Sequence, residues 1–96
     1  MRHVLKCDQP HYDAVVSGAK TFEIRFNDRD YAVGDELELH PMNAFRALDP
    51  DRSVTVTVTY MVEGEYGLRD RFVVLGFDAV FRVWGPVERL TVKEAQ

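Results

Sequence analysis

The chain lacks most of the features of membrane, secreted and polyanion-binding proteins. Its single cysteine, Cys7, cannot form an internal disulfide, so a reducing cytoplasm is the expected compartment. No stretch approaches the roughly 18 consecutive apolar residues of a membrane-spanning helix, and the polar residues after Met1 predict no signal-peptide core. Basic residues are outnumbered, because 12 Lys and Arg against 16 Asp and Glu give a net charge of −4. Nonspecific nucleic-acid affinity depends on cations that neutralise phosphates, so the composition argues against a general polyanion binder and favours a small-molecule partner.

The residues that are present are sufficient for one packed core. The 96 residues are 46% apolar and 11% aromatic, which is typical of one small globular domain and unlike a disordered chain. No repeat or internal linker divides the sequence. We therefore expect a single domain over residues 1–96, with the polar segment 86–96 as a flexible tail.

Apolar alternation predicts a mainly β (α+β) fold with about five to six strands. Strands are predicted over 2–7, 21–26, 36–40, 53–62 and within 71–83. A short helix between the first two strands is indicated by Asp8 or Gln9 as its cap, by Pro10 in its first turn and by Gly18 just past its end. The mostly antiparallel order favours a small closed or nearly closed barrel.

The same patterns predict how the strands face the core. Phe22, Ile24 and Phe26 share one face of their strand, which we expect to pack behind it, while Glu23 and Arg25 share the other face. The valines of 53–62, together with Tyr60, are expected in the core, and Gly76 is expected at a bulge or bend. The connection 41–52 is long for a hairpin and is therefore expected to be mobile or functional.

The segment 18–29, GAKTFEIRFNDR, concentrates charges of both signs in one strand and the turn after it. Its polar members are Lys20, Glu23, Arg25, Asn27, Asp28 and Arg29. Folding alone does not require so many charges at one strand, so the segment is a candidate polar pocket. Simpler interpretations exist: Lys20 can complement the helix dipole, Glu23 and Arg25 can form a surface ion pair, and Asn27 can bond its own turn.

The spacing of these residues resembles a known family. The matching motifs are His3-x-Leu5-Lys6, Pro10-x-Tyr12, Gly18-x-Lys20-x-Phe22-Glu23-x-Arg25-x-Asn27-Asp28-Arg29 and Val33-Gly34-Asp35. They resemble the ASCH domain of the PUA-like superfamily and, more narrowly, the DUF3850 family of small bacterial and phage proteins. Weaker similarity continues to about Phe77.

This resemblance implies a PUA-like β-barrel whose cleft, between the barrel and the early helix, binds RNA or a nucleotide-like ligand. The residues expected to bind the ligand are Lys20, Glu23, Arg25, Arg29, Lys6, His3 and Asn27. No cofactor and no metal is expected, although the spacing of His3, Cys7 and His11 invites a metal-site interpretation. Tyr31, Tyr66 and Trp84 either stack on a base or pack within the barrel.

Two alternatives remain open. Some ASCH branches resemble amidohydrolases or nucleases, and Lys20 with Glu23 would be the acid–base pair of such an enzyme. Glu23 stands where the amidohydrolase branch has a threonine nucleophile, and this difference weighs against the threonine-dependent mechanism. The other alternative is a phage or plasmid accessory protein that binds a host protein, which is compatible with the acidic charge.

Overall fold

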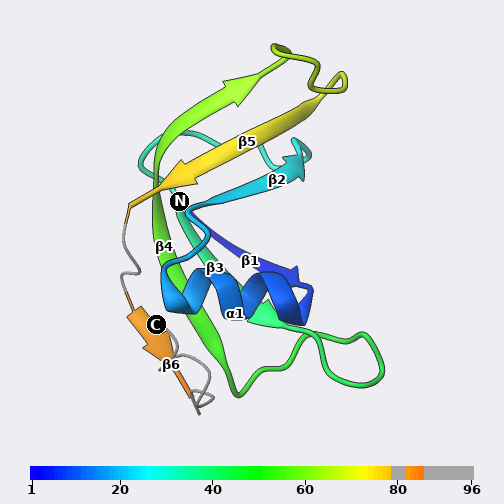
Figure 1. The fold of residues 1–96 in the computed structure, drawn as a ribbon, viewed down its shortest axis with the longest axis vertical. Helices are drawn as coiled ribbons and strands as arrows, with labels where there is room; N and C mark the ends of the chain where they lie inside the picture. The colour runs from blue at the N-terminus through cyan, green and yellow to red at the C-terminus, as the bar shows by residue number, and fades with distance from the viewer. Residues whose placement is uncertain (79–81, 86–96) are drawn as a thin grey trace.

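A single curled sheet forms most of the protein. The structure, a computed structural model, describes residues 1–78 and 82–85, and the predicted tail 86–96 lies outside them. The elements are β1 (Arg2–Cys7), α1 (Gln9–Ser17), β2 (Phe22–Phe26), β3 (Glu36–Pro41), β4 (Ser53–Glu63), β5 (Phe72–Phe77) and β6 (Arg82–Trp84). The sheet curls into a half-barrel, and α1 lies beside β3 and β4 (Figure 1). This arrangement confirms the predicted mainly β fold with one helix between the first two strands.

The order of the strands leaves two edges facing each other. The main path is β1-β3-β4-β5-β2, and β6 pairs with the first part of β4. Only β1 and β3 are parallel among the described pairs. No backbone pairing joins β1 to β2 in the part of the chain that the structure describes. The barrel is therefore half-open where a closed or nearly closed one was expected.

The core lies on the concave side of the sheet. Its fully buried members include Leu37 and Leu39 from β3 and Val54 and Val56 from β4, as the alternation predicts. From α1, Tyr12 and Val15 pack onto the same core cluster. The buried stripe thus fixes the helix against the sheet at the point where the chain turns into β2.

The predicted orientation of β2 is wrong. Phe22, Ile24 and Phe26 are 40%, 54% and 45% exposed, whereas Glu23 is buried at 4%. The register explains the inversion, because Glu23 lies opposite Leu75, which points into the core. The inward face of this edge strand therefore borders a polar cleft, and its three large apolar side chains lie on the convex face.

A second difference lies in β4, where the register shifts between Val58 and Tyr60. One extra residue in a strand reverses the faces of the residues that follow it. Val58 is consequently buried while Tyr60 is 69% exposed, which contradicts the expected core position of Tyr60. Val62 lies on the same face as Tyr60 and is only partly buried, so its expected core position is also wrong. Gly76 was expected at a bulge or bend. It pairs regularly with Phe22 in β2, and the extra residue of the bulge lies in β4, next to Tyr60, which pairs with Gly76.

None of the helices within residues 1–78 and 82–85 has the length and apolar character needed to cross a membrane.

The end of α1 depends on Gly18. Its φ is 86°, in the left-handed region, and its N–H donates to the Val15 carbonyl at 3.1 Å, as expected for a helix C-cap. A methyl group at this position would meet no atom within 4 Å, so only the backbone conformation disfavours another residue.

We therefore expect Gly18→Ala to lower the free energy of unfolding by about 1 kcal/mol, because alanine is strained at positive φ. Urea denaturation measures this change. Gly18→Asn is the matched control, and it should cost less because asparagine tolerates the left-handed region better. Equal losses in the two variants would contradict this interpretation.

A buried polar cluster holds the first strand at its start. Asp35 Oδ2 lies 2.8 Å from His3 Nε2 and accepts the Ala32 N–H at 3.0 Å, and its Oδ1 accepts from the Met1 amino group at 3.2 Å. The His3 ring also packs edge-on against Tyr31. The hydrogen bond from His3 is the largest of the effects that hold the pKa of Asp35 below its ordinary value.

Because its pKa is lowered by folding, Asp35 stabilises the protein above its unfolded pKa of about 4, and this stabilisation disappears as the pH falls through the lower folded value. Asp35→Asn should therefore be less stable at pH 7 and lose less stability on acidification than the parent. Urea denaturation between neutral pH and about pH 2 checks this. Parallel pH profiles for the two proteins would contradict it.

Candidate functional site

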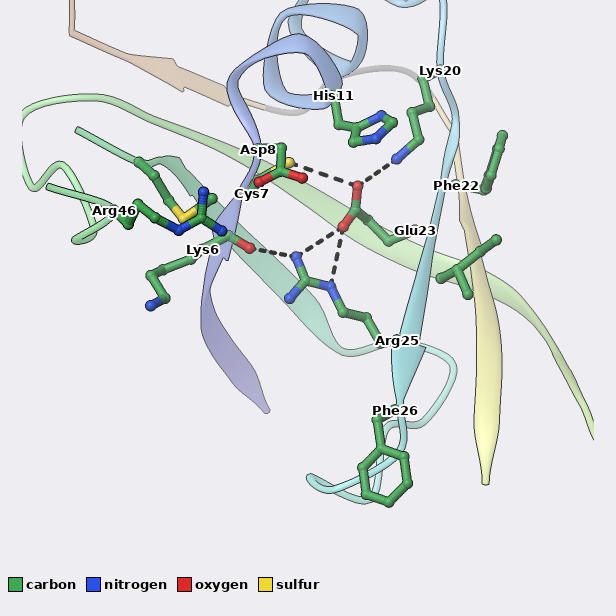
Figure 2. A pocket seen from close by; sticks show the side chains of 12 residues that line it. Lys6, Cys7, Asp8, His11, Lys20, Phe22, Glu23, Arg25, Phe26 and Arg46 are labelled. Atoms are coloured by element: carbon green, nitrogen blue, oxygen red, sulfur yellow. Dashed lines mark hydrogen bonds and ion pairs between the residues drawn. The ribbon is translucent and has the colours of Figure 1, made fainter. Parts of the chain in front are cut away.

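A polar cleft of about 700 Å³ lies where the β1 and β2 edges face each other. The end of β1, the start of α1, the segment from Lys20 to Phe26 and the loop after β3 form its walls. Its lining residues are Lys6, Cys7, Asp8, His11, Lys20, Phe22, Glu23, Ile24, Arg25, Phe26, Met42 and Arg46. Figure 2 shows this arrangement, with Glu23 and Arg25 extending from β2 toward β1.

Glu23 lies at the centre of the cleft between two cations. Its Oε2 accepts from Lys20 Nζ at 2.7 Å, and its Oε1 accepts from Arg25 Nη2 at 2.9 Å and Nε at 3.1 Å (Figure 2). The Glu23 side chain is only 5% exposed, so these bonds replace most of its hydration. A buried carboxylate with charged donors on both oxygens is a fixed structural anion.

Arginine side chains bridge the gap between the two strand edges. Arg25 Nη2 also donates to the Lys6 carbonyl of β1 at 2.6 Å, and Arg29 Nη1 donates to the Val4 carbonyl at 3.3 Å. These two guanidinium groups satisfy acceptors that a neighbouring strand would otherwise bond. The opening between β1 and β2 is thus maintained by side chains, which leaves space for the cleft above Arg25.

Cys7 lines the cleft, and its thiol is unreactive. Its Sγ lies 3.9 Å from Glu23 Oε2. Burial, followed by the nearby Glu23 charge, raises the pKa of the thiol to about 12. Cys7 therefore remains protonated near neutral pH, and the geometry gives no support for a thiolate nucleophile.

The cleft is locally basic within an acidic protein. Four cationic side chains line it against two carboxylates, a local charge of +2 with His11 neutral, while the whole chain carries −4. Among the described residues, Lys20 Nζ donates one hydrogen bond and has two N–H groups left, and Arg25 donates through Nε and Nη2 but not through Nη1. The cleft can therefore offer charged donors to an anionic or carbonyl-bearing ligand.

The structure brings together some of the predicted binding residues and separates others. Lys6, Lys20, Glu23 and Arg25 line the cleft. His3 lies instead in the cluster with Asp35 and Tyr31.

The other predicted residues also lie outside the cleft lining. Asn27 accepts the Tyr31 N–H at 3.1 Å within its turn, and Arg29 bridges to β1. Of the aromatic candidates, Tyr31 is buried in the core, while Tyr66 and Trp84 are exposed away from the cleft.

Sequence reasoning missed the wall contributed by the 41–52 connection. Met42 and Arg46 from this loop face the cleft. The loop is fastened at its far end, where Arg52 Nη2 donates to Gln9 Oε1 of α1 at 3.0 Å and Arg52 Nε donates to Asp49 Oδ2 at 3.2 Å. The unusual length of the connection was the available signal, but it did not indicate which residues would face the cleft.

Among residues 1–78 and 82–85, no three histidine, cysteine or carboxylate side chains gather in a geometry that would hold a metal ion.

Comparison with protein families gives a match. The model of a family described as "Domain of unknown function (DUF3850)" matches residues 2–77, which include β1 through β5 and all of the cleft lining. A search of curated proteins finds no match.

We predict that Glu23→Gln destabilises the protein by about 2–4 kcal/mol, because it leaves two partly buried cations without their carboxylate. The side chains of Lys20 and Arg25 are 16% and 22% exposed, so water only partly replaces the lost anion. The matched control is Glu36→Gln, whose ion pair with Arg2 lies at the surface and whose loss should hardly change the free energy of unfolding. Similar losses for the two variants in urea denaturation would contradict the proposed role of Glu23.

Proposed function

The chain belongs to the DUF3850 family, and we propose that it binds a nucleotide-like ligand or a short RNA in the cleft centred on Lys20, Glu23 and Arg25. The observation that carries this proposal is a basic cleft of about 700 Å³ on a protein with a net charge of −4. This volume lies within the range of about 300–1,000 Å³ that is usual for small-molecule sites.

The charged donors of the cleft suit a phosphate or a base edge. Arg25 keeps Nη1 for a ligand while Glu23 and the Lys6 carbonyl fix the rest of its guanidinium group. A guanidinium group fixed in this way has little conformational entropy left to lose on binding. Lys20, fixed by the same carboxylate, supplies a point charge at the other end of Glu23.

The apolar part of the lining suits a flat ring. Met42 borders the cleft beside its cations, whereas Phe22 and Phe26 reach only its edge from the convex side of β2. A thioether side chain packs favourably against an aromatic ring, at about 0.3–1.5 kcal/mol. A ligand that combines a planar ring with an anionic or carbonyl group would therefore use both parts of the lining.

The contacts of Glu23 favour binding over hydrolysis. A general base must be free to approach a proton of the substrate. Both Glu23 oxygens already accept from Lys20 or Arg25, and the nearby Cys7 thiol stays protonated. The cleft is thus better suited to hold a ligand than to transfer protons to it.

We also propose that the protein belongs to the PUA-like superfamily and is located in the cytoplasm. The half-barrel, its helix after the first strand and the position of the Gly18-x-Lys20-x-x-Glu23-x-Arg25 motif at the cleft support placement in the ASCH branch of the PUA-like superfamily. The single, buried, unpaired cysteine is consistent with a reducing cytoplasm.

We expect the parent protein to bind nucleoside monophosphates or short single-stranded RNAs, and Lys20→Ala/Arg25→Ala to weaken this binding at least tenfold, because both donors are lost. Isothermal titration against a mixed panel of these ligands measures the change. Arg2→Ala is the matched control, since it removes a cation from the opposite edge of β1 and should bind as the parent does. Unchanged binding in the double variant would reject the proposal, and Glu23-dependent turnover of an acylated nucleoside would favour the hydrolase instead.

A further inference from the structure

The convex face of β2, β5 and β4 carries an apolar patch, three members of which, Phe22, Ile24 and Phe26, also reach the edge of the cleft. The strand registers arrange its members in three rows across the sheet. Tyr60, Gly76 and Phe22 form the first row, Val62, Val74 and Ile24 the second, and Phe72 and Phe26 the third. We call these eight residues the outer patch. Two structural features create the outer patch: the outward orientation of the apolar face of β2 and the bulge in β4.

The outer patch is of the size that often marks a functional surface on a small protein. Phe22, Ile24, Phe26 and Tyr60 are between 40% and 69% exposed. Together they expose roughly 400 Å² of side chain, because a large apolar side chain presents about 150–250 Å² when free. A stable interface covers about 800 Å² of each partner, and the partly buried Val62, Phe72 and Val74, together with the polar rim, can supply the rest.

The patch is better suited to protein than to nucleic acid. Bases stack on free aromatic faces, but cations already lie over three rings of the patch. Arg71 lies 5.2 Å from the ring centre of Phe26, Arg69 lies 6.0 Å from that of Phe72, and Lys20 lies 5.0 Å from that of Phe22. These cations form a polar rim around an apolar centre, which is the usual composition of a protein interface.

We infer that the outer patch binds a second copy of this chain face to face. The two copies are related by a two-fold axis that lies in the interface, runs across the strands and follows the middle row. Such an axis places β5 over β5 of the partner and exchanges the first row with the third. Phe72 of each copy then lies over Gly76 of the other, where the missing side chain leaves room for the ring. Val62, Val74 and Ile24 meet their own counterparts.

Charge complementarity favours this pairing with a second copy. Arg71 precedes β5 at one end of the patch, and the exposed Asp78 follows β5 at the other end. The two-fold axis therefore places Arg71 of each copy beside Asp78 of the other, and one ion pair forms at each end of the paired β5 strands. Without the axis, these opposite charges remain at opposite ends of β5.

The same axis places the two clefts at one side of the assembly. β2 borders both the cleft and the outer patch, because its alternate side chains face opposite ways. In the dimer, β2 lies over β2 of the partner and the two clefts are neighbours. The dimer itself does not depend on the ligand proposed above, so its test needs no ligand.

Sedimentation equilibrium of the ligand-free full chain between about 1 and 200 μM is the test. We expect a dimer at the upper concentrations. Tyr60→Glu and Ile24→Glu should each weaken dimerisation by roughly 100-fold, because each buries an unpaired charge at the interface. Val33→Glu is the matched control: Val33 is 60% exposed in the turn before β3, and its substitution should leave the dimer intact. Circular dichroism verifies that each variant is folded.

A charge exchange separates this symmetric dimer from other associations. Arg71→Glu and Asp78→Arg should each weaken dimerisation by roughly threefold to tenfold, and the double variant should restore it, because opposite charges face each other again. A monomeric parent at 200 μM would overturn the inference. So would patch variants that dimerise as the parent does, or a double variant no better than the single ones. Loss of RNA binding on Tyr60→Glu in a monomeric parent would assign the patch to nucleic acid instead.

Discussion

The pairing of Glu23 with Lys20 and Arg25 is the interaction on which the arrangement of this protein depends. Glu23 is 4% exposed, and charged donors from Lys20 and Arg25 replace water at both of its oxygens, which makes its inward orientation tolerable. Once Glu23 faces the concave side, the period of two in a strand turns Phe22 and Ile24 outward. One buried ion pair network thus determines the polar cleft on one side of the strand and an apolar surface on the other.

The open seam of the barrel follows from the same network. Arg25 reaches the Lys6 carbonyl while it holds Glu23, and Arg29 reaches the Val4 carbonyl farther along β1. Guanidinium groups separate strands more widely than a backbone ladder does, since the ladder brings neighbouring strands to about 4.8 Å. The half-barrel therefore retains a polar opening that direct pairing of β1 with β2 would remove.

Much of the fold could be predicted because local rules and burial agree. Gly18 ends the helix in the left-handed region, and Val54 and Val56 lie in the core as the alternation of β4 indicates. The faces of β2 could not be predicted, since alternation defines two faces but does not identify the inner one. The usual assignment of apolar residues to the core failed because Glu23 has partners in Lys20 and Arg25 that lie close in sequence but act only in the fold.

The cleft was predictable only in part, for a related physical reason. Glu23 and Arg25 lie two residues apart in β2 and therefore share a face, so the sequence alone predicted that they act together. Met42 and Arg46 reach the cleft through the path of a long loop, which Arg52 fastens to α1, and no local pattern encodes that path. His3 begins in the expected strand, but its side chain pairs with Asp35, which is 32 residues away in the sequence.

Stability alone does not account for the charged centre of the cleft. Replacing a buried ion pair by well-packed apolar residues is often neutral or stabilising, because the charges must be desolvated. A chain selected only to fold could therefore bury the apolar face of β2 and leave Glu23 in solvent. The inverted strand instead fixes the guanidinium group of Arg25 with unused donors toward an open cleft. Such preorganisation lowers the entropy cost of binding, and the ligand that we propose would account for the energetically expensive orientation of β2.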